Sequence, residues 1–160
     1  MTKTYKWGIL GPGKIAHRFA DALQNVPAAE TYAVASRDKN RALEFAATYR
    51  IPVVHDNYES LIQDPEVDII YIATPHSFHH EQAIMCLNNK KAVLCEKPLS
   101  VDHKRALQIV TAARNNNTFR MEAMWTRFFP IQVRLRELLA SGAIGTPRGL
   151  IIHHNYMAAV

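Results

Sequence analysis

The stretch formed by residues 7–16 constrains the fold of this chain more than any other. It contains most of a short apolar strand (Tyr5–Leu10), the turn Gly11-Pro12-Gly13 and the start of an amphipathic helix. The apolar side chains of that helix recur at helical spacing; they are Ile15, Ala16, Phe19, Ala20 and Leu23. A strand, a glycine turn and a helix in this order form the local context of a dinucleotide-binding motif.

Each small residue of the turn has a defined role in this interpretation. Gly11 permits a tight turn, and Gly13 has no Cβ, so a pyrophosphate can approach the backbone. Ala16 stands at the third glycine position and is small enough for helix and strand to pack closely. The helix N-terminus at Lys14 and Ile15 offers N–H groups and a partial positive charge to phosphates. The alternative is an ordinary strand–turn–helix, because glycine-rich turns are common.

Strand and helix signals alternate through the first 121 residues. Further strands are expected at residues 30–35, 51–54, 67–73, 92–95 and 118–121. Helices are expected after the capping residues Asp38, Asn57 and Ser100, and over residues 77–88. The helix after Ser100 is expected to bury Ala106, Leu107, Val110 and Ala113. The alternation predicts an α/β fold, a doubly wound Rossmann-type parallel sheet with helices on both faces.

The character of the chain changes after Met121. Residues 122–129 are rich in aromatic side chains, and Pro130 is expected to begin a helix. The apolar face of that helix would be Ile131, Leu135, Leu138 and Leu139. Residues 148–156 are expected to form a strand that pairs with another strand, because a lone strand does not hold its shape in water. We therefore expect a dinucleotide-binding domain over residues 1–121, and over residues 122–160 the incomplete start of an α+β domain for substrate binding and oligomerisation.

Composition narrows the class of protein. The chain has 160 residues, of which 48% are hydrophobic and 21% charged, as in a globular domain with a sizeable core. No apolar run is long enough for a membrane span and no signal peptide is evident, so a cytoplasmic protein is expected. Cys86 and Cys95 lie in apolar segments and are expected to be buried free thiols in a reducing compartment. The net charge of +5 is scattered, which suits an anionic small ligand better than nucleic acid.

Four expected strands end in groups that can bind a ligand or react with one. In an open parallel sheet, ligands bind beyond the carboxyl ends of the strands. The groups are Gly11-Pro12-Gly13, Ser36-Arg37, Thr74-Pro75-His76 and Glu96-Lys97-Pro98. Because all four would lie along one edge of the sheet, the sequence predicts a single cofactor site there.

The end of the second expected strand favours NADP over NAD. Proteins that bind NAD usually carry Asp or Glu at this position for the ribose diol. Here the position holds Ser36, with Arg37 next to it and Arg41 one helical turn later. A guanidinium can bind a 2′-phosphate through two hydrogen bonds, and the serine hydroxyl can add a third. The alternative is a pair of solvated arginines at a helix start, since Arg is usually exposed.

Lys97 is the candidate catalytic residue. It lies between Glu96 and Pro98, directly after a strand that is expected to be buried. Its ammonium group can hydrogen-bond a nicotinamide ribose and a substrate hydroxyl, or work as an acid or base. The alternative is an ordinary loop lysine.

Histidines and aromatic residues give weaker signals. His76 is expected to contact the cofactor, with His79 facing the same cleft. Together with His80 these histidines suggest a metal site, but no Cys or carboxylate completes it, so no metal is expected. Trp125 and Arg127 are either core of the second domain or walls of the substrate pocket.

Taken together, these motifs resemble the glucose-fructose oxidoreductase / inositol dehydrogenase family. They are similar above all to its branch of dimeric dihydrodiol dehydrogenases and NADP-dependent D-xylose dehydrogenases. The motifs that carry the resemblance lie at residues 11–16, 35–38, 73–79, 92–98 and 121–130. The resemblance covers nearly the whole chain, and the combination of motifs is specific although each one alone is not.

The resemblance implies an NADP-dependent oxidoreductase that acts on sugars or vicinal diols. It implies that Lys97 contacts the nicotinamide and the substrate hydroxyl, and that Trp125 lies near the substrate. It implies cofactor contacts from the remaining motif positions, which include Arg37, Arg41, Thr74, Pro75, His76, His79, Glu96 and Arg127. Family members continue into a second domain that supplies the proton-transfer partner. We therefore expect this chain to bind cofactor better than it turns over substrate.

The sequence thus predicts the NADP-binding half of an oxidoreductase that transfers a hydride between a nicotinamide cofactor and a sugar or vicinal diol. The expected partners are a small-molecule substrate and further copies of the chain, without nucleic acid or membrane. The alternative is a non-catalytic NADP-binding module that senses redox state or serves in assembly. Such a module would have no need for Lys97 at the nicotinamide.

Overall fold

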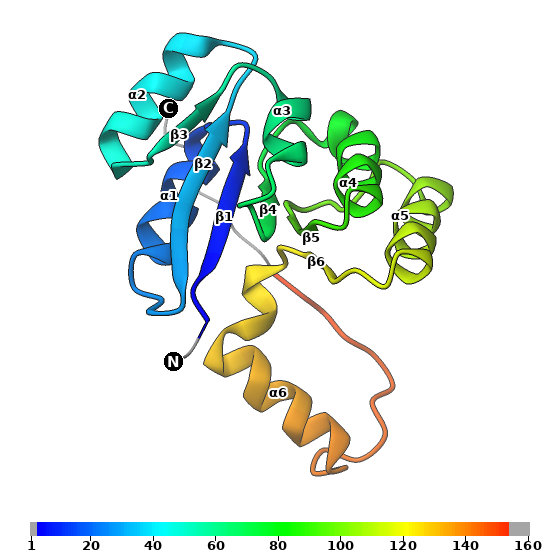
Figure 1. Ribbon diagram of the computed structural model, residues 1–160. Coiled ribbons are helices and arrows are strands. Elements are labelled where there is room, and N and C mark those ends of the chain that lie inside the picture. The colour runs from blue at the N-terminus through cyan, green and yellow to red at the C-terminus, as the bar shows by residue number, and fades with distance from the viewer. Residues whose placement is uncertain (1–2, 154–160) are drawn as a thin grey trace. The chain divides into compact units, whose positions relative to one another are not determined.

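The computed structural model describes residues 3–153, which divide into a first unit ending at Ala123 and a second beginning at Met124. The first unit contains a six-stranded parallel sheet with the order β3-β2-β1-β4-β5-β6 (Figure 1). The strands are β1 (Tyr5–Leu10), β2 (Ala29–Ala35), β3 (Val53–His55), β4 (Ile69–Ile72), β5 (Ala92–Cys95) and β6 (Arg120–Glu122). Because the strand order reverses between β1 and β4, the predicted doubly wound Rossmann-type fold is confirmed.

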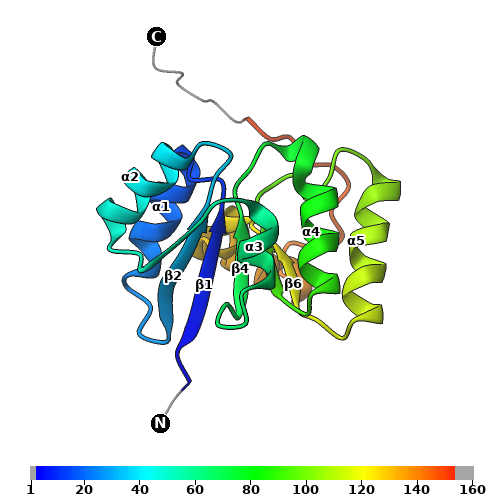
Figure 2. The same cartoon turned by 45° about the horizontal axis from the view of Figure 1, so that its top comes forward.

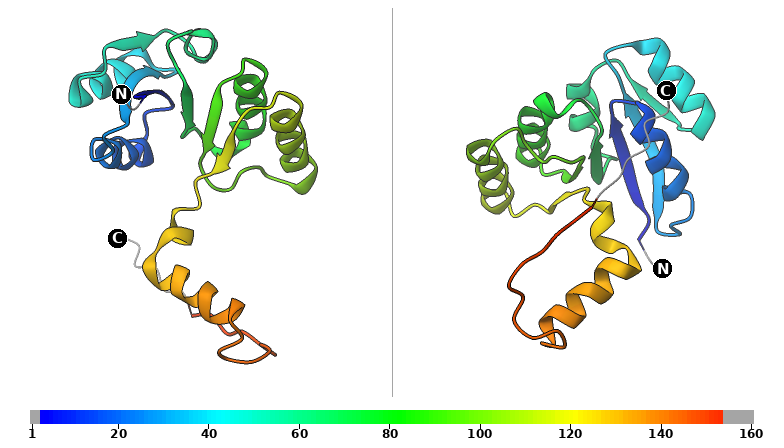
Figure 3. Two further views of the ribbon diagram at one scale, coloured as in Figure 1. Left: turned by 60° about the horizontal axis from the view of Figure 1, so that its bottom comes forward. Right: turned by 180° about the vertical axis from the view of Figure 1, so that it is seen from behind.

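Helices cover both faces of this sheet. They are α1 (Lys14–Leu23), α2 (Lys39–Tyr49), α3 (Tyr58–Gln63), α4 (His79–Asn88) and α5 (His103–Asn115), with the 3₁₀ turn η1 (His76–Phe78) before α4. The helices α1 and α2 lie on one face, and α3, α4 and α5 on the other (Figure 2). The helices α4 and α5 run side by side, as two further views show (Figure 3).

The central strands supply two cores because their side chains alternate between the two faces. Ile9 belongs to the core that includes side chains of α1 and α2, whereas its neighbour Leu10 belongs to the core that includes side chains of α3, α4 and α5. In β4, Tyr71 belongs to the first core, and Ile70 and Ile72 belong to the second. This confirms the prediction that the fourth strand is buried on both faces, although it begins at Ile69 and not at residue 67.

The expected caps of α2 and α3 are confirmed, but that of α5 is wrong. Asp38 accepts hydrogen bonds from the N–H groups of Asn40 and Arg41, and Asn57 caps α3 in the same way. The helix α5 begins two residues later than a Ser100 cap would require, and it is capped by the carboxylate of Asp102. A carboxylate directly before the first helical residue meets the free N–H groups, which the Ser100 hydroxyl does not reach.

The buried face of α5 also differs from the expected one. Of the four expected residues, Ala113 is buried as predicted, Ala106 and Val110 are half-buried, and Leu107 is 52% exposed. Ile109, which was not expected to be buried, is the second buried residue of the helix. Residues four positions apart share a helix face, and residues two apart do not. Ile109, which is fully buried, therefore turns Leu107 towards solvent.

The second unit contains the 3₁₀ turn η2 (Trp125–Phe128) and the helix α6 (Pro130–Ala140). The helix begins at Pro130, as predicted, but three of its expected apolar residues are exposed; these are Ile131, Leu135 and Leu139. The strand predicted over residues 148–156 is absent from residues 148–153, and residues 154–156 lie outside the described residues. The described part of this unit offers no other strand with which this segment could pair.

Two further observations bear on the class of protein. In the part of the chain that the structure describes, no helix is both long and apolar enough to cross a membrane. Cys86 and Cys95 are buried free thiols, as predicted. Burial raises the pKa of the Cys95 thiol to about 12, so the group stays protonated and unreactive at neutral pH.

Candidate cofactor-binding site

The carboxyl ends of the central strands lie at one level. The sheet register pairs Leu10 with Ala35 on one side and with Ile72 on the other, and Ile72 pairs with Cys95. Each of these residues ends its strand. The loops that follow β1, β2, β4 and β5 therefore begin side by side at the same edge of the sheet.

The glycine turn after β1 brings two of these loops into contact. Gly11 has a φ of +83°, a conformation that residues with a Cβ rarely adopt. A Cβ at this position would lie 2.9 Å from Cγ2 of Thr74 and 3.2 Å from its backbone nitrogen. A Cβ on Gly13, in contrast, would meet no atom within 4 Å. The turn is therefore packed tightly against the loop after β4 but open in front of Gly13.

The N-terminus of α1 opens onto the same edge. Unlike α2, α3 and α5, this helix has no side-chain cap. The carbonyl of Gly13 accepts the N–H groups of Ala16 and His17, which leaves those of Lys14 and Ile15 available at the first turn. Ala16 is fully buried against the sheet, and Lys14 and Ile15 are exposed. Such a helix end favours an anion.

Two cavities lie at this edge. The larger, of about 650 Å³, is lined by Gly11, Pro12, Gly13, Ser36, Arg37, Asp38, Arg41, Tyr58, Ala73, Thr74 and Pro75. The smaller, of about 300 Å³, is lined by Ser36, Arg37, Asp56, Asn57, Tyr58, Glu59, Pro75, Phe78 and Gln82. The two share four residues and so form adjoining parts of one site. The site brings together most of the phosphate- and ribose-binding residues expected from the sequence.

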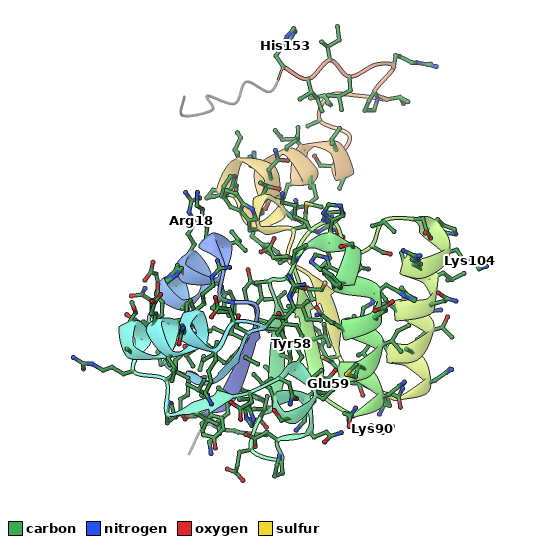
Figure 4. The ribbon with its side chains drawn as sticks, turned by 90° about the horizontal axis from the view of Figure 1, so that it is seen from above. Arg18, Tyr58, Glu59, Lys90, Lys104 and His153 are labelled. Atoms are coloured by element: carbon green, nitrogen blue, oxygen red, sulfur yellow. The ribbon has the colours of Figure 1, made fainter. Side chains whose placement is uncertain are left out.

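Several lining residues were missed by the sequence analysis. Tyr58 and Glu59 project from the first turn of α3 (Figure 4), and Phe78 and Gln82 come from η1 and α4. Asn57 was identified only as a helix cap. A signal was present, because an aromatic residue directly after a cap, behind an edge strand of a parallel sheet, falls at the ligand-binding edge.

The phosphate-binding candidates are free to act on a ligand. Ser36 is 8% exposed, and its Oγ accepts the N–H of Asp38 at 3.1 Å, which leaves the hydroxyl proton to be donated. Within residues 3–153, Arg37 and Arg41 form no ion pair. The Asp38 carboxylate faces the N–H groups at the start of α2. The cavity wall therefore carries two guanidinium groups without a carboxylate partner, an arrangement that suits a phosphate.

The loop after β5 is held by one buried carboxylate, Glu96, and one half-buried carboxylate, Glu122. Oε1 of Glu96 accepts the hydroxyl of Tyr71 at 2.7 Å, and its Oε2 accepts the N–H of Lys97 at 3.2 Å. Glu122, on the neighbouring strand β6, accepts the N–H of Leu99 at 2.7 Å. Burial, followed by the contact with Glu96, raises the pKa of Tyr71, so its hydroxyl remains a donor. The predicted contact of Glu96 with a cofactor stays a prediction, and in this structure both its oxygens face protein donors.

Lys97 itself is exposed beyond this framework. Among the described residues its ammonium group has no carboxylate partner. The Lys97–Pro98 peptide bond is cis. The hydrogen bonds that Glu96 and Glu122 accept from the N–H groups of Lys97 and Leu99 hold the backbone here, while the side chain of Lys97 stays available to a ligand.

His79 does not face the cleft, contrary to the expectation from the sequence. The side chain is 1% exposed. Its Nδ1 lies 2.8 Å from the carbonyl oxygen of Pro98, and its Nε2 lies 2.9 Å from that of Thr74. As the first residue of α4, His79 turns inward and joins the loops after β4 and β5, whose carbonyls need donors. His76, in η1, is exposed, and its contact with a cofactor stays a prediction.

Trp125 and Arg127 belong to the second unit. The ring of Trp125 packs edge-on against Phe129 with centroids 5.1 Å apart, and the carbonyl of Arg127 accepts a hydrogen bond from Arg136. Both side chains are exposed. Their expected positions beside cofactor and substrate stay predictions.

Metal-binding side chains do not gather in residues 3–153. No group of three or more His, Cys, Asp and Glu residues there is arranged to hold a metal ion. His80, the third histidine of the local cluster, has its Nε2 2.8 Å from Oε1 of Gln108 on α5.

Comparison with known sequences identifies relatives of the first unit. Residues 5–123 match the family described as "Oxidoreductase family, NAD-binding Rossmann fold". The chain is 46% identical over 145 residues to the trans-1,2-dihydrobenzene-1,2-diol dehydrogenase of Mus musculus, covering 89% of this chain and 44% of that protein. It is 44% identical over 142 residues to the Xenopus laevis protein of the same name, covering 88% of this chain and 43% of the relative. The chain thus spans less than half the length of these relatives.

Solved structures share the fold. An NAD-binding oxidoreductase from Klebsiella pneumoniae superposes with a TM-score of 0.83 at 28% identity, over 89% of this chain and 40% of that one. A 3-ketoreductase from Actinomadura kijaniata, in complex with NADP and TDP-benzene, gives a TM-score of 0.81 at 29% identity, over 88% and 43%. Relatives of this fold therefore include proteins named for NAD and proteins solved with NADP.

Proposed function

This chain belongs to the oxidoreductase family with an NAD-binding Rossmann fold, and from that premise we propose that it is the NADP-binding part of an enzyme acting on a sugar or vicinal diol. A nicotinamide cofactor, when bound, supplies the acceptor or donor of a hydride. The substrate carbon that exchanges the hydride bears a hydroxyl, whose proton must leave during oxidation. The dehydrogenases of diols among the relatives support this substrate class.

One observation carries the proposed choice of NADP. Arg37 and Arg41 line the cavity at the open N-terminus of α1 and, within residues 3–153, have no ion-pair partner. Ser36 stands where a carboxylate would bind the ribose diol of NAD. Two free guanidinium groups and a hydroxyl donor match the charge and the acceptors of a 2′-phosphate. The open turn at Gly13 and the first N–H groups of α1 would bind the pyrophosphate.

Lys97 is the proposed catalytic residue. Its ammonium group would donate hydrogen bonds to the nicotinamide ribose and to the oxygen of the substrate hydroxyl. These bonds would position the hydroxyl and stabilise the negative charge that develops on its oxygen, while the proton would pass to a partner residue of the second domain. Three side chains, those of Glu96, Glu122 and His79, hydrogen-bond to the backbone of the loop from which Lys97 projects. Because the side chain has no carboxylate partner among the described residues, its donors remain available to ligands.

The remaining proposals concern the whole enzyme. We propose that residues 122–160 begin a substrate domain through which copies of the enzyme associate, and that Trp125 and Arg127 border the substrate. A cytoplasmic location is part of the same proposal. The alternative of a non-catalytic sensor module is not favoured, because the family is one of oxidoreductases and the named relatives are dehydrogenases.

The test compares two nucleotides and two arginine variants. NADPH should bind more tightly than NADH, as measured by titration of the nucleotide fluorescence. Arg37→Ala should weaken NADPH binding by about 1.5–3 kcal/mol, the value of a hydrogen bond to a charged group, and leave NADH nearly unchanged. The matched control is Arg18→Ala, which also removes one positive charge. Arg18 projects from the outer part of α1 (Figure 4) and lines neither cavity. Equal dissociation constants of the unmutated chain for NADPH and NADH would refute the choice of NADP.

A further inference from the structure

We propose that Phe78 determines cofactor specificity by holding the guanidinium group of Arg37 where a 2′-phosphate binds. The proposal rests on the function proposed above and deepens it, because it concerns how one cavity discriminates between two nucleotides. Phe78 ends the 3₁₀ turn η1, in the loop that follows β4, whereas Arg37 follows β2. The two residues line the same cavity of about 300 Å³.

The contact between them has the geometry of a cation–π pair. Cζ of Arg37 lies 5.3 Å from the centroid of the Phe78 ring. A guanidinium within about 6 Å of a ring centroid is attracted by the negative face of the ring. Phe78 is 38% exposed, so one part of the ring packs on the protein while the rest is accessible. The ring is thus an anchor at the cavity wall.

Arg37 needs such an anchor because no carboxylate provides one. The structure records no ion pair for Arg37 between residues 3 and 153. The adjacent Asp38 faces the first N–H groups of α2 instead. A long arginine side chain with free rotamers loses conformational entropy when a ligand fixes it. A side chain that already rests on a ring loses less.

The chemical nature of the anchor matters as much as its position. A carboxylate would orient the guanidinium but would also neutralise it and occupy the N–H donors that a phosphate needs. The face of an aromatic ring attracts the cation without accepting its in-plane hydrogen bonds. Phe78 therefore leaves both the charge and the donors of Arg37 available. Because NADH lacks the 2′-phosphate, this advantage benefits NADP alone.

A double-mutant cycle tests this proposal. Phe78→Ala should weaken NADPH binding two- to fivefold, as expected from about 0.5–1 kcal/mol for an exposed cation–π pair, without changing NADH binding. Phe78→Tyr, which keeps the ring, should retain the preference of the unmutated chain for NADPH over NADH. In an Arg37→Ala background, Phe78→Ala should have no further effect on NADPH. Phe119→Ala removes another exposed ring, which lies outside both cavities, and serves as the control.

Three results would overturn the proposal. One is an equal loss of NADPH and NADH affinity in Phe78→Ala, which would mean that the ring supports the nucleotide in general. Another is that Phe78→Ala weakens NADPH binding in the Arg37→Ala background as much as it does in the unmutated chain. The third is loss of the preference in Phe78→Tyr. Failure of the unmutated chain to bind either nucleotide would instead refute the proposed function, and thermal unfolding of each variant shows whether the fold is intact.

Discussion

The loops after β5 and β2 begin at the same edge of the sheet but are held in different ways. The first is fixed by buried or half-buried side chains, because Glu96, Glu122 and His79 all bond to its backbone. The second has one helix cap, from Asp38, and one hydrogen bond from the N–H of Asp38 to Oγ of Ser36. The side chain of Arg37 rests on an aromatic ring. The backbone of the loop after β5 is thus held by side chains of the protein. The loop after β2 carries the positive charges of Arg37 and Arg41, which form no ion pair among the described residues.

This difference matches the two tasks proposed for these loops, catalysis by Lys97 and phosphate binding by Arg37 and Arg41. A residue that acts on a reacting atom gains from a backbone fixed before the ligand arrives, since small misplacements slow the reaction. Residues that bind a phosphate can be left unpaired, because the ligand itself brings the opposite charge. The structure pairs carboxylates with backbone donors around Lys97. Asp38, Asp56 and Glu59 also line the cavities, but among the described residues none of them forms an ion pair with Arg37 or Arg41.

The largest effect is expected at the fixed loop. In the complete enzyme, Lys97→Met should lower kcat by about 10²–10⁴-fold, the usual contribution of a positioned acid or base. The affinity for NADPH should change little, because the loops after β1 and β2 keep their contacts. Steady-state kinetics and nucleotide titration measure the two quantities. Lys104→Met, on the outer face of α5 (Figure 4), is the control, and near-normal turnover of Lys97→Met would remove the lysine from the mechanism.

An intermediate effect is expected on the unfolding free energy when the side chains that hold the two loops are removed one at a time. Glu122→Ala leaves the N–H of Leu99 without its charged acceptor and should lower the unfolding free energy by about 1.5–3 kcal/mol. Asp38→Ala removes an exposed helix cap and should cost only about 1 kcal/mol. Urea denaturation of the first unit compares the two. An equal or larger loss for Asp38→Ala would mean that the fixed and open loops are not held differently.

The smallest effect is expected at Asp56, which follows β3 and lines the smaller cavity beside the loop after β2. Nζ of Lys39 lies 2.7 Å from Oδ1 of Asp56, and both side chains are largely exposed. The hydrogen bond from Lys39, together with its charge, lowers the pKa of Asp56, which is therefore ionised at neutral pH. Asp56→Asn removes this negative charge from the smaller cavity and should tighten NADPH binding by no more than about fivefold. The gain should vanish at about 1 M salt, where such charges are screened; a gain that persists there would have another cause.

Much of the fold could be predicted from local sequence. The bounds of β1 and β5, the caps Asp38 and Asn57, and the start of α6 at Pro130 all follow from short-range signals. The errors arose where two local signals competed. Ser100 and Asp102 both suit a helix cap, and the position of the helix start decided between them. Ile109 is buried and Leu107 is not, because Ile109 shares a helix face with the buried Ala113 and Leu107 does not.

The candidate site was less accessible to sequence reasoning. The glycine turn and the polar strand ends could be identified, because parallel strands bring their carboxyl ends to one edge. The inward orientation of His79 could not, since it depends on two carbonyls from different loops. Nor did the sequence indicate that Phe78 meets Arg37.

The sequence by itself determined most elements of the first unit, the glycine turn at Gly11 and the chemistry of the strand ends, because these depend on neighbouring residues. Only the tertiary structure decided which distant groups meet. It fixed the strand order, the hydrogen bond from Tyr71 to Glu96 and the contact of Phe78 with Arg37. The physical reason is that such contacts arise from packing across the sheet, where residues far apart in the chain become neighbours and burial decides which polar atoms must be paired.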